Sequence, residues 1–207
     1  MCPPYVSPLR EAQAAQTRRR ILDAAANAFR TSGYAGTSLS QIAGDAGVSL
    51  ETVKQNGPKA ALLLAAFDYA FTGTEDDSPL HQRASLEGIR NLPDEELLLG
   101  LVTFIAQANS RVATLWPRLL EASLADAGVG RRITALQQNR RLDMEEAIAL
   151  LRHRGLCQSP RPDSELAGAL SFLISPESYH QLVLDADWSS NAYRDWLVEA
   201  VERLILT

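Results

Sequence analysis

Residues 37–56 contain the feature that most constrains the fold, two very short helices joined by a glycine turn. Ser38 lies three residues before a glutamine, the spacing of a capping box, in which the serine hydroxyl accepts a hydrogen bond from the backbone N–H at the start of a helix. That helix is predicted to end at Gly47, because glycine tolerates the positive φ of an abrupt turn. Ser49 is the predicted N-cap of the second short helix, over 50–56.

A longer helix precedes this pair and an apolar helix follows it. Apolar residues at helical spacing predict a helix over 11–31, with Gly33 as its terminator. Pro58 is predicted at the first position of a fourth helix, which runs to Phe71. A long helix followed by two short ones across a sharp turn is typical of the helix-turn-helix, whose second short helix enters the major groove of DNA.

The rest of the chain is predicted to be helical as well, and no strand pattern is convincing. We predict helices at 80–91, 94–113, 115–127, 129–154, 162–174, 176–185 and 190–206, the last capped by Ser189 with Trp188 stapled onto Tyr193. The predicted fold is therefore all-α, with a three-helix N-terminal head and a larger C-terminal helical domain. The expected divisions are a flexible tail over 1–10, a helix-turn-helix domain over 11–57, and a regulatory domain over 58–207.

Charge is distributed unevenly between these parts. Residues 1–60 hold seven basic and four acidic side chains, a net charge of +3, so the remainder carries −8 of the total of −5. Both lysines of the chain, Lys54 and Lys59, lie in this basic head. A positive head on an acidic protein is consistent with a localised nucleic-acid contact and argues against nonspecific coating of nucleic acid.

Several other classes of protein are disfavoured by the sequence. No uncharged apolar stretch of membrane-spanning length and no secretory signal pattern is present, so we expect a cytoplasmic protein without a membrane partner. Cys2 and Cys157 form no disulfide framework, and His153 lacks further metal ligands nearby. No nucleophile with a base, no catalytic carboxylate pair and no phosphate-binding glycine loop stands out. We therefore expect no enzyme activity, no cofactor and no metal.

The head resembles that of TetR-family repressors in a dense, ordered series of residues over about 18–67. The matching positions are Arg20-Ile21-Leu22-Asp23-Ala24-Ala25, Phe29, Gly33-Tyr34, Thr37-Ser38, Ile42-Ala43, Ala46-Gly47-Val48-Ser49, Thr52-Val53, Lys59 and Leu62-Leu63. Such heads usually continue into tyrosine, a second aromatic or histidine, and phenylalanine before the lysine, whereas this chain has Lys54-Gln55-Asn56-Gly57-Pro58. The run is one residue shorter and lacks the aromatics that normally touch phosphate or brace the recognition helix.

The resemblance implies a ligand-responsive, homodimeric repressor, whose C-terminal part is the ligand-binding and dimerisation domain. Its partners would be a double-stranded DNA operator, expected to be palindromic, and a small, mostly apolar effector. Two apolar helices would pair across a two-fold axis as a four-helix bundle. The residues expected on their pairing faces are Leu166, Leu170, Phe172 and Leu173, and Trp196, Leu197, Val201 and Leu204.

Candidate DNA contacts follow from residue type. We expect phosphate or minor-groove contacts from Arg18, Arg19, Ser38, Thr52, Lys54 and Lys59, a DNA contact from the helix cap Ser49, and base contacts from Leu50, Glu51, Gln55 and Asn56. A purely structural interpretation stays open for several of these residues. Ser38 can cap its helix, Glu51 can interact with the positive end of the helix dipole, and Arg18 and Arg19 can form a solvated basic end of their helix.

Candidate effector contacts are large apolar residues of the C-terminal part, within a cavity expected among residues 94–188. They are Phe104, Trp116, Leu119, Leu120, Tyr179 and Trp188, and the alternative for each is a place in the core. The alternative for the whole chain is a helical dimeric adaptor or ligand-binding protein that has lost DNA binding through its altered recognition helix.

Overall fold

The structure is a computed structural model that describes residues 8–75 and 79–207, and it is all-α over these residues. The head consists of α1 (Pro8–Gly36), α2 (Leu39–Ala46) and α3 (Leu50–Gln55), and α4 (Lys59–Thr72) leads out of it. The C-terminal part contains α5 (Ala84–Arg90), α6 (Asp94–Val112), α7 (Trp116–Ala125), α8 (Ala127–His153), α9 (Asp163–Leu173), α10 (Pro176–Tyr179) and α11 (Ser190–Val201). Shorter helical turns are η1 (Leu80–Gln82), η2 (His180–Asp185) and η3 (Glu202–Leu206).

The local signals of the head are confirmed. The Ser38 hydroxyl accepts from the Gln41 N–H at 3.1 Å, and the Ser49 hydroxyl accepts from the Thr52 N–H at 3.0 Å. Gly47 has φ 62° and ends α2. A Cβ on Gly47 would lie 2.9 Å from an Arg20 nitrogen, so conformation and space both favour glycine there.

Two predicted helix boundaries differ at the N-terminal end. Helix α1 begins at Pro8 and continues to Gly36 through a kink at Gly33, whose φ is 69°. Residues 8–10 are therefore helical rather than part of a flexible tail, while residues 1–7 lie outside the described residues. Pro58 precedes α4 as its N-cap instead of occupying the first helical position.

The C-terminal helices also differ in detail from the prediction. The segment predicted as one helix over 176–185 is a single α-turn continued by the π-turn η2. Ser189 caps α11 as expected, by accepting from the Ala192 N–H at 3.1 Å. Trp188 packs edge-on against Trp196, with ring centroids 6.1 Å apart, whereas the predicted staple partner Tyr193 is fully buried. Trp196 lies one turn of α11 after Tyr193 and is less buried than Tyr193, so it can contact Trp188.

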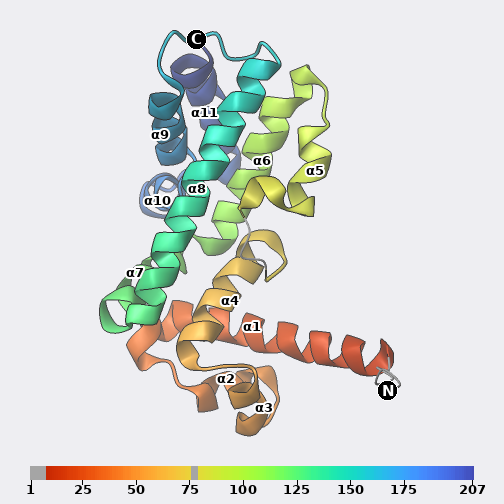
Figure 1. The fold of residues 1–207 in the computed structure, drawn as a ribbon. Helices are drawn as coiled ribbons and strands as arrows, with labels where there is room; N and C mark the ends of the chain where they lie inside the picture. Colours follow the sequence, from red (N-terminus) through yellow and green to blue (C-terminus); the bar gives the residue numbers. More distant parts are fainter. Residues whose placement is uncertain (1–7, 76–78) are drawn as a thin grey trace.

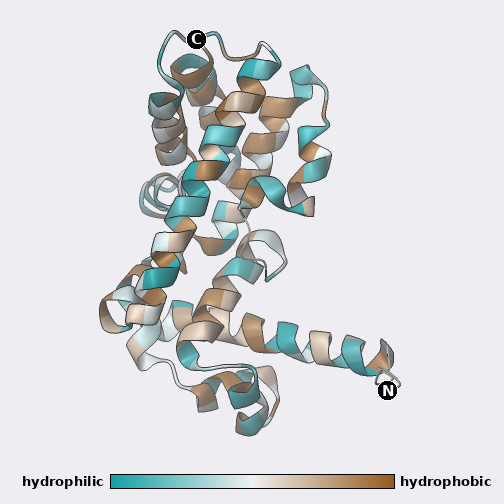
Figure 2. Ribbon diagram, in the orientation of Figure 1, coloured by the Kyte–Doolittle hydropathy of each residue, from teal (hydrophilic) through white to brown (hydrophobic). Residues whose placement is uncertain are grey.

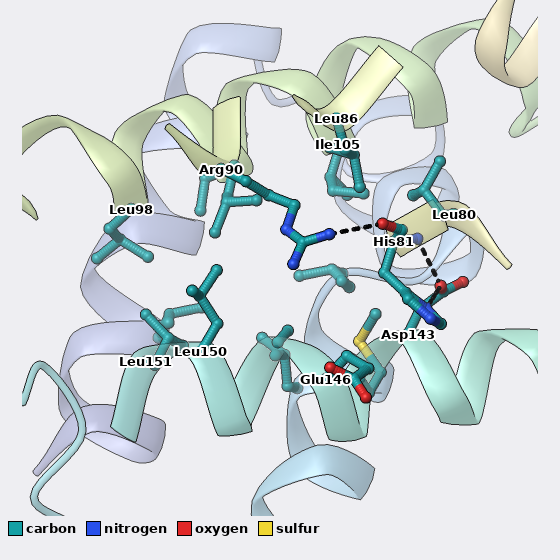
Figure 3. A pocket seen from close by; sticks show the side chains of 17 residues that line it. Leu80, His81, Leu86, Arg90, Leu98, Ile105, Asp143, Glu146, Leu150 and Leu151 are labelled. Carbon is teal, nitrogen blue, oxygen red and sulfur yellow. Dashed lines mark hydrogen bonds and ion pairs between the residues drawn. The ribbon is translucent and has the colours of Figure 1, made fainter. Parts of the chain in front are cut away.

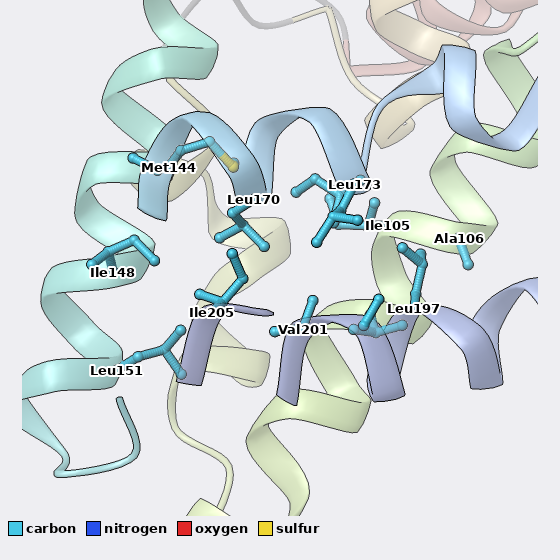
Figure 4. Close-up of a cluster of buried hydrophobic side chains, with 14 of the residues drawn as sticks. Ile105, Ala106, Met144, Ile148, Leu151, Leu170, Leu173, Leu197, Val201 and Ile205 are labelled. Carbon is cyan, nitrogen blue, oxygen red and sulfur yellow. The ribbon is translucent and has the colours of Figure 1, made fainter. Parts of the chain in front are cut away.

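Two apolar cores hold the molecule together. The first lies between the head, α4, α7 and the start of α8, and includes Phe29, Leu62 and Leu119. The second lies between α6, α8, α9 and α11, where Ile105 and Leu170 converge with their neighbours (Figure 4). Because the head shares its core with helices beyond residue 58, the helix-turn-helix packs directly onto the regulatory part.

The helices of the C-terminal part are not equally apolar. Figure 2 shows α6 largely in brown, whereas α8 alternates between teal and brown along its length. Helix α8 thus turns one face to the core and the other to solvent.

Most residues predicted for the dimer face belong instead to the second core. Leu166, Leu170, Leu173, Leu197 and Val201 are all buried within the single chain. Val201 is 1% exposed, so a charge placed there would destabilise the fold of the subunit rather than a contact between subunits. Phe172 and Leu204, by contrast, are 73% and 53% exposed.

Candidate DNA interface and effector cavity

The helix-turn-helix lies at the end of the molecule opposite the C-terminal helices (Figure 1). Along α3, four exposed side chains occupy positions separated by one, three and four residues, which places them on one face of the helix. They are Leu50, Glu51, Lys54 and Gln55. Thr52 is half-buried, and its hydroxyl is hydrogen-bonded to that of Ser49 at 2.8 Å. The exposed face of α3 thus combines an apolar, an acidic, a basic and an amide side chain.

The arginines of α1 are engaged within the molecule. Arg18 forms an ion pair with Glu75 at 2.5 Å and donates to the Asn56 carbonyl at 2.7 Å. The Arg19 guanidinium lies 5.9 Å from the centre of the Tyr69 ring. Arg18 thereby ties the end of α3 to the segment that follows α4.

Asn56 and Lys59 are also used internally. The Asn56 amide donates to the Thr52 carbonyl at 2.8 Å and so caps the end of α3. The Lys59 ammonium donates to the carbonyls of Tyr34 and Thr37 at 2.8 and 3.1 Å. It also lies 4.5 Å from the centre of the Tyr34 ring. These contacts stabilise the junctions that position α2 and α3, where the usual aromatics are missing.

A cavity of about 540 Å³ lies beside α4, in the C-terminal part of the chain. Residues of α4, α7, α8, α9 and α10 line it, together with Leu80, Arg83 and Ile105. The wall extends back to Phe67, outside the predicted range of 94–188, because α4 leaves the head along one side of the cavity.

The six predicted effector contacts fall in different places. Trp116 lines the 540 Å³ cavity, and Phe104 lines a groove between α6 and the end of α5. Leu119 and Tyr179 are buried in the two cores, while Leu120 and Trp188 lie on the surface. Packing in the cores explains the apolar character of Leu119 and Tyr179. The sequence pattern alone did not separate core residues from residues that line the cavity.

The carboxylates of the cavity wall have partners. Asp68 pairs with Arg132 at 3.1 Å. Asp143 accepts from the backbone N–H of His81 at 2.9 Å and lies 2.8 Å from Nδ1 of the same imidazole. The Glu177 carboxylate accepts from the Trp116 indole N–H at 2.6 Å.

Arg140 is a partly buried cation of the same wall. Its Nε donates to the Ser171 hydroxyl at 2.9 Å, and a terminal nitrogen donates to the Ser171 carbonyl at 2.6 Å. Removal from water lowers the pKa of Arg140, because burial disfavours the charged form; the negative charges of Glu177 and Asp143 act in the opposite direction. Arg140 and Ser171 connect α8 to α9 at the cavity.

A smaller, apolar cavity of about 90 Å³ adjoins the larger one (Figure 3). Both are lined by Leu80, Ile105, Asp143, Met144 and Ile174, which form the partition between them. Figure 3 shows Arg90 reaching across toward His81, whose carbonyl accepts from the guanidinium at 2.8 Å.

Sequence reasoning missed the polar residues of the cavity. A signal exists for Asp68, which is the only charged residue between Lys59 and Thr72 and interrupts an apolar helix. Arg140 carries no such signal, because α8 contains many charged residues and only packing decides which of them faces inward.

Helix α4 links this cavity to the head. Its first residue, Lys59, bonds to the head, and its Phe67 and Asp68 side chains line the cavity. Arg111 on α6 donates to the carbonyls of Ala70 and Phe71 at 2.6 and 2.7 Å, which holds the far end of α4. Helix α4 therefore contacts both the head and the wall of the cavity.

Residues 8–75 and 79–207 contain neither a metal-binding cluster nor a single membrane-spanning helix. No group of three or more His, Cys, Asp or Glu side chains there is placed to hold a metal ion. No single helix in that part of the chain has the length and apolar character to cross a membrane; α6 and α7 meet those criteria only as a pair, bent by 55°.

Comparison with known proteins identifies the fold through solved structures of low sequence identity. The sequence matches no protein-family profile and no curated protein. Among solved structures, a candidate TetR-family transcriptional regulator from Rhodococcus has a TM-score of 0.68 at 17% identity, covering 93% of this chain and 100% of its own. A candidate transcriptional regulator from Saccharomonospora viridis, crystallised with choline, also has a TM-score of 0.68, at 20% identity, covering 93% of this chain and 99% of its own.

NalD of Pseudomonas aeruginosa, the secondary repressor of the MexAB-OprM multidrug efflux pump, has a TM-score of 0.63 at 20% identity. That similarity covers 94% of this chain and 98% of NalD. The chain therefore has the fold of TetR-family transcriptional regulators over nearly its whole length, as the residues of its head predicted.

Proposed function

We propose that this protein is a TetR-family transcriptional regulator, a homodimer that binds a specific DNA operator under the control of a small effector. The observation that carries the proposal is the exposed face of α3, on a helix-turn-helix at one end of the molecule. An α-helix fits the major groove, and the side chains on this face suit base edges. Gln55 suits the donor and acceptor of adenine, Glu51 the amino group of cytosine, and Leu50 the methyl group of thymine.

Charge supports the same orientation. The first sixty residues carry +3 while the remainder carries −8, so the acidic body favours approach to DNA through the head. Lys54 is exposed on the α3 face and suits a phosphate contact.

The cavity supports control by a small molecule. A ligand seated between α4 and α8 shifts the head only if it binds one position of α4 more tightly than the other. Helix α4 connects the two sites, because its side chains line the cavity and its first residue bonds to the head. The choline complex of the Saccharomonospora viridis protein supports small-molecule binding by this fold.

The exposed apolar residues support a homodimer. Phe172 on α9 and Leu204 in η3 are the exposed members of the predicted pairing face. Two such faces related by a two-fold axis would bury these side chains and present two heads to a palindromic operator. Repression is the direction we propose, by analogy with NalD.

Selection of bound DNA from a random pool tests this function. We expect a palindrome whose half-site centres are about 10 bp, or a multiple of it, apart. The matched control is the double variant Lys54→Ala with Gln55→Ala, which should lose the enrichment while retaining its helical content. Recovery of no preferred sequence by the unmodified protein would instead favour the non-binding helical adaptor. A reporter gene carrying the selected operator then tests repression.

A further inference from the structure

We propose that the 540 Å³ cavity binds an amphipathic carboxylate, with its anionic group at Arg140 and its apolar part against the aromatic wall. This inference rests on the proposed function only in treating the cavity as an effector site. It names the chemical class of the effector.

Arg140 is the group that would bind the anion. Among the residues that the structure describes, no Asp or Glu oxygen lies within 4.0 Å of its guanidinium, whose hydrogen bonds go to the hydroxyl and carbonyl oxygens of Ser171. These bonds use Nε and one terminal nitrogen, and the other terminal nitrogen has no acceptor among those residues. A partly buried guanidinium that no carboxylate contacts is costly unless an anion completes it, and the nearby charges of Glu177 and Asp143 offset only part of that cost.

The acidic residues of the wall already have partners. Asp68 is paired with Arg132, Asp143 with His81, and Glu177 accepts from the indole of Trp116. A cationic ligand would have to compete for these carboxylates with partners already in place. An anionic ligand finds two donor groups together, because the guanidinium of Arg140 and the hydroxyl of Ser171 lie 2.9 Å apart.

The apolar wall defines the rest of the ligand. Four aromatic rings line the same cavity, namely Phe67, Phe71, Trp116 and Phe172. Phe67 stacks on Phe71 with centroids 6.3 Å apart and meets Trp116 at 5.7 Å, so three of these rings form one continuous surface. A rigid or aromatic body is stabilised on such a surface by burial and ring packing. The adjoining 90 Å³ cavity adds apolar space beyond Met144 for a longer ligand.

Three probes with one skeleton test the charge preference: 4-phenylbutanoate, 4-phenylbutanol and 4-phenylbutylamine. Titration calorimetry and thermal melting are recorded at pH 7.5 on the full chain. We expect the carboxylate to bind about 10- to 100-fold more tightly than the alcohol, the range of a hydrogen-bonded charge, and the amine to bind no better than the alcohol. Equal binding of all three, tightest binding of the amine, or no binding at millimolar concentration overturns the proposal.

Arg140→Met should abolish the preference for the carboxylate and leave binding of the alcohol unchanged. Arg140→Lys keeps a positive charge and should therefore retain part of the preference for the carboxylate. If Arg140 had only a structural role, the charge of the substituted residue would not affect this preference. Arg141→Met is the matched control, because Arg141 is the next residue of α8 and is exposed. If the preference survives in Arg140→Met, the assignment of the anion site is wrong.

The two proposals fail in different ways. Loss of DNA selection together with carboxylate binding that depends on Arg140 would remove the regulator and leave the ligand site. DNA selection without any preference for the carboxylate would remove the ligand class and leave the regulator.

Discussion

Replacement of Phe172 by serine tests the proposed homodimer at the most exposed apolar residue of the predicted pairing face. Phe172 is 73% exposed in the single chain and lies on α9, whereas its neighbours Leu170 and Leu173 face the core. The substitution removes a surface ring and leaves the subunit core intact. We therefore expect the variant to fold and to lose association.

The magnitude follows from the exposed area. A phenylalanine has roughly 200 Å² of surface, so its exposed part is about 150 Å², and complete burial at about 25 cal/mol/Å² contributes about 4 kcal/mol per subunit. Two subunits contribute symmetrically, but burial at an interface converts only in part to affinity. With about half of this energy realised, the dimer dissociation constant should rise by roughly two to three orders of magnitude.

Analytical ultracentrifugation over a range of concentrations measures this change directly. Leu124→Ser is the matched control, since Leu124 is 91% exposed but lies on α7, outside the proposed face. Operator affinity should fall together with dimerisation, because each head alone contacts one half-site. Since Phe172 also lines the cavity, effector binding is measured in parallel. An unchanged dissociation constant for Phe172→Ser would refute the pairing face.

Further predictions concern the head. Lys54→Ala should weaken binding to all DNA sequences about equally and reduce the salt dependence of log K by about 0.9 per head, measured by titration at several salt concentrations. Gln55→Ala should cost about 1–3 kcal/mol at one base position and leave the salt slope intact, measured with operators substituted base by base. Glu75→Gln should strengthen DNA binding and steepen the salt slope, because it removes a carboxylate 2.5 Å from Arg18. If Lys54→Ala changes neither affinity nor slope, the head docks differently or does not bind DNA; an unchanged slope for Glu75→Gln would leave Arg18 a purely structural role.

The helix-turn-helix was predictable from the sequence because its determinants are local. Ser38 and Ser49 bond to N–H groups three residues away, and the positive φ of Gly47 is a property of that residue and its turn. Such contacts form wherever the segment folds, so spacing alone identifies them. The all-α class follows in the same way from helical spacing along the chain.

Tertiary structure decided which of these residues are available to a partner. Arg18 meets Glu75 57 positions away, and Lys59 bonds to carbonyls 22 and 25 positions earlier, so both charges that local reasoning assigned to DNA also contact the protein itself. The cavity likewise joins Arg140 of α8 to Ser171 of α9, 31 positions apart. No periodicity encodes such pairs, because an inward-facing arginine and a solvated one have the same spacing on a helix. The sequence by itself determined the kind of head this protein has, and packing determined where its cavity lies, since packing alone sets which side chains lose contact with water.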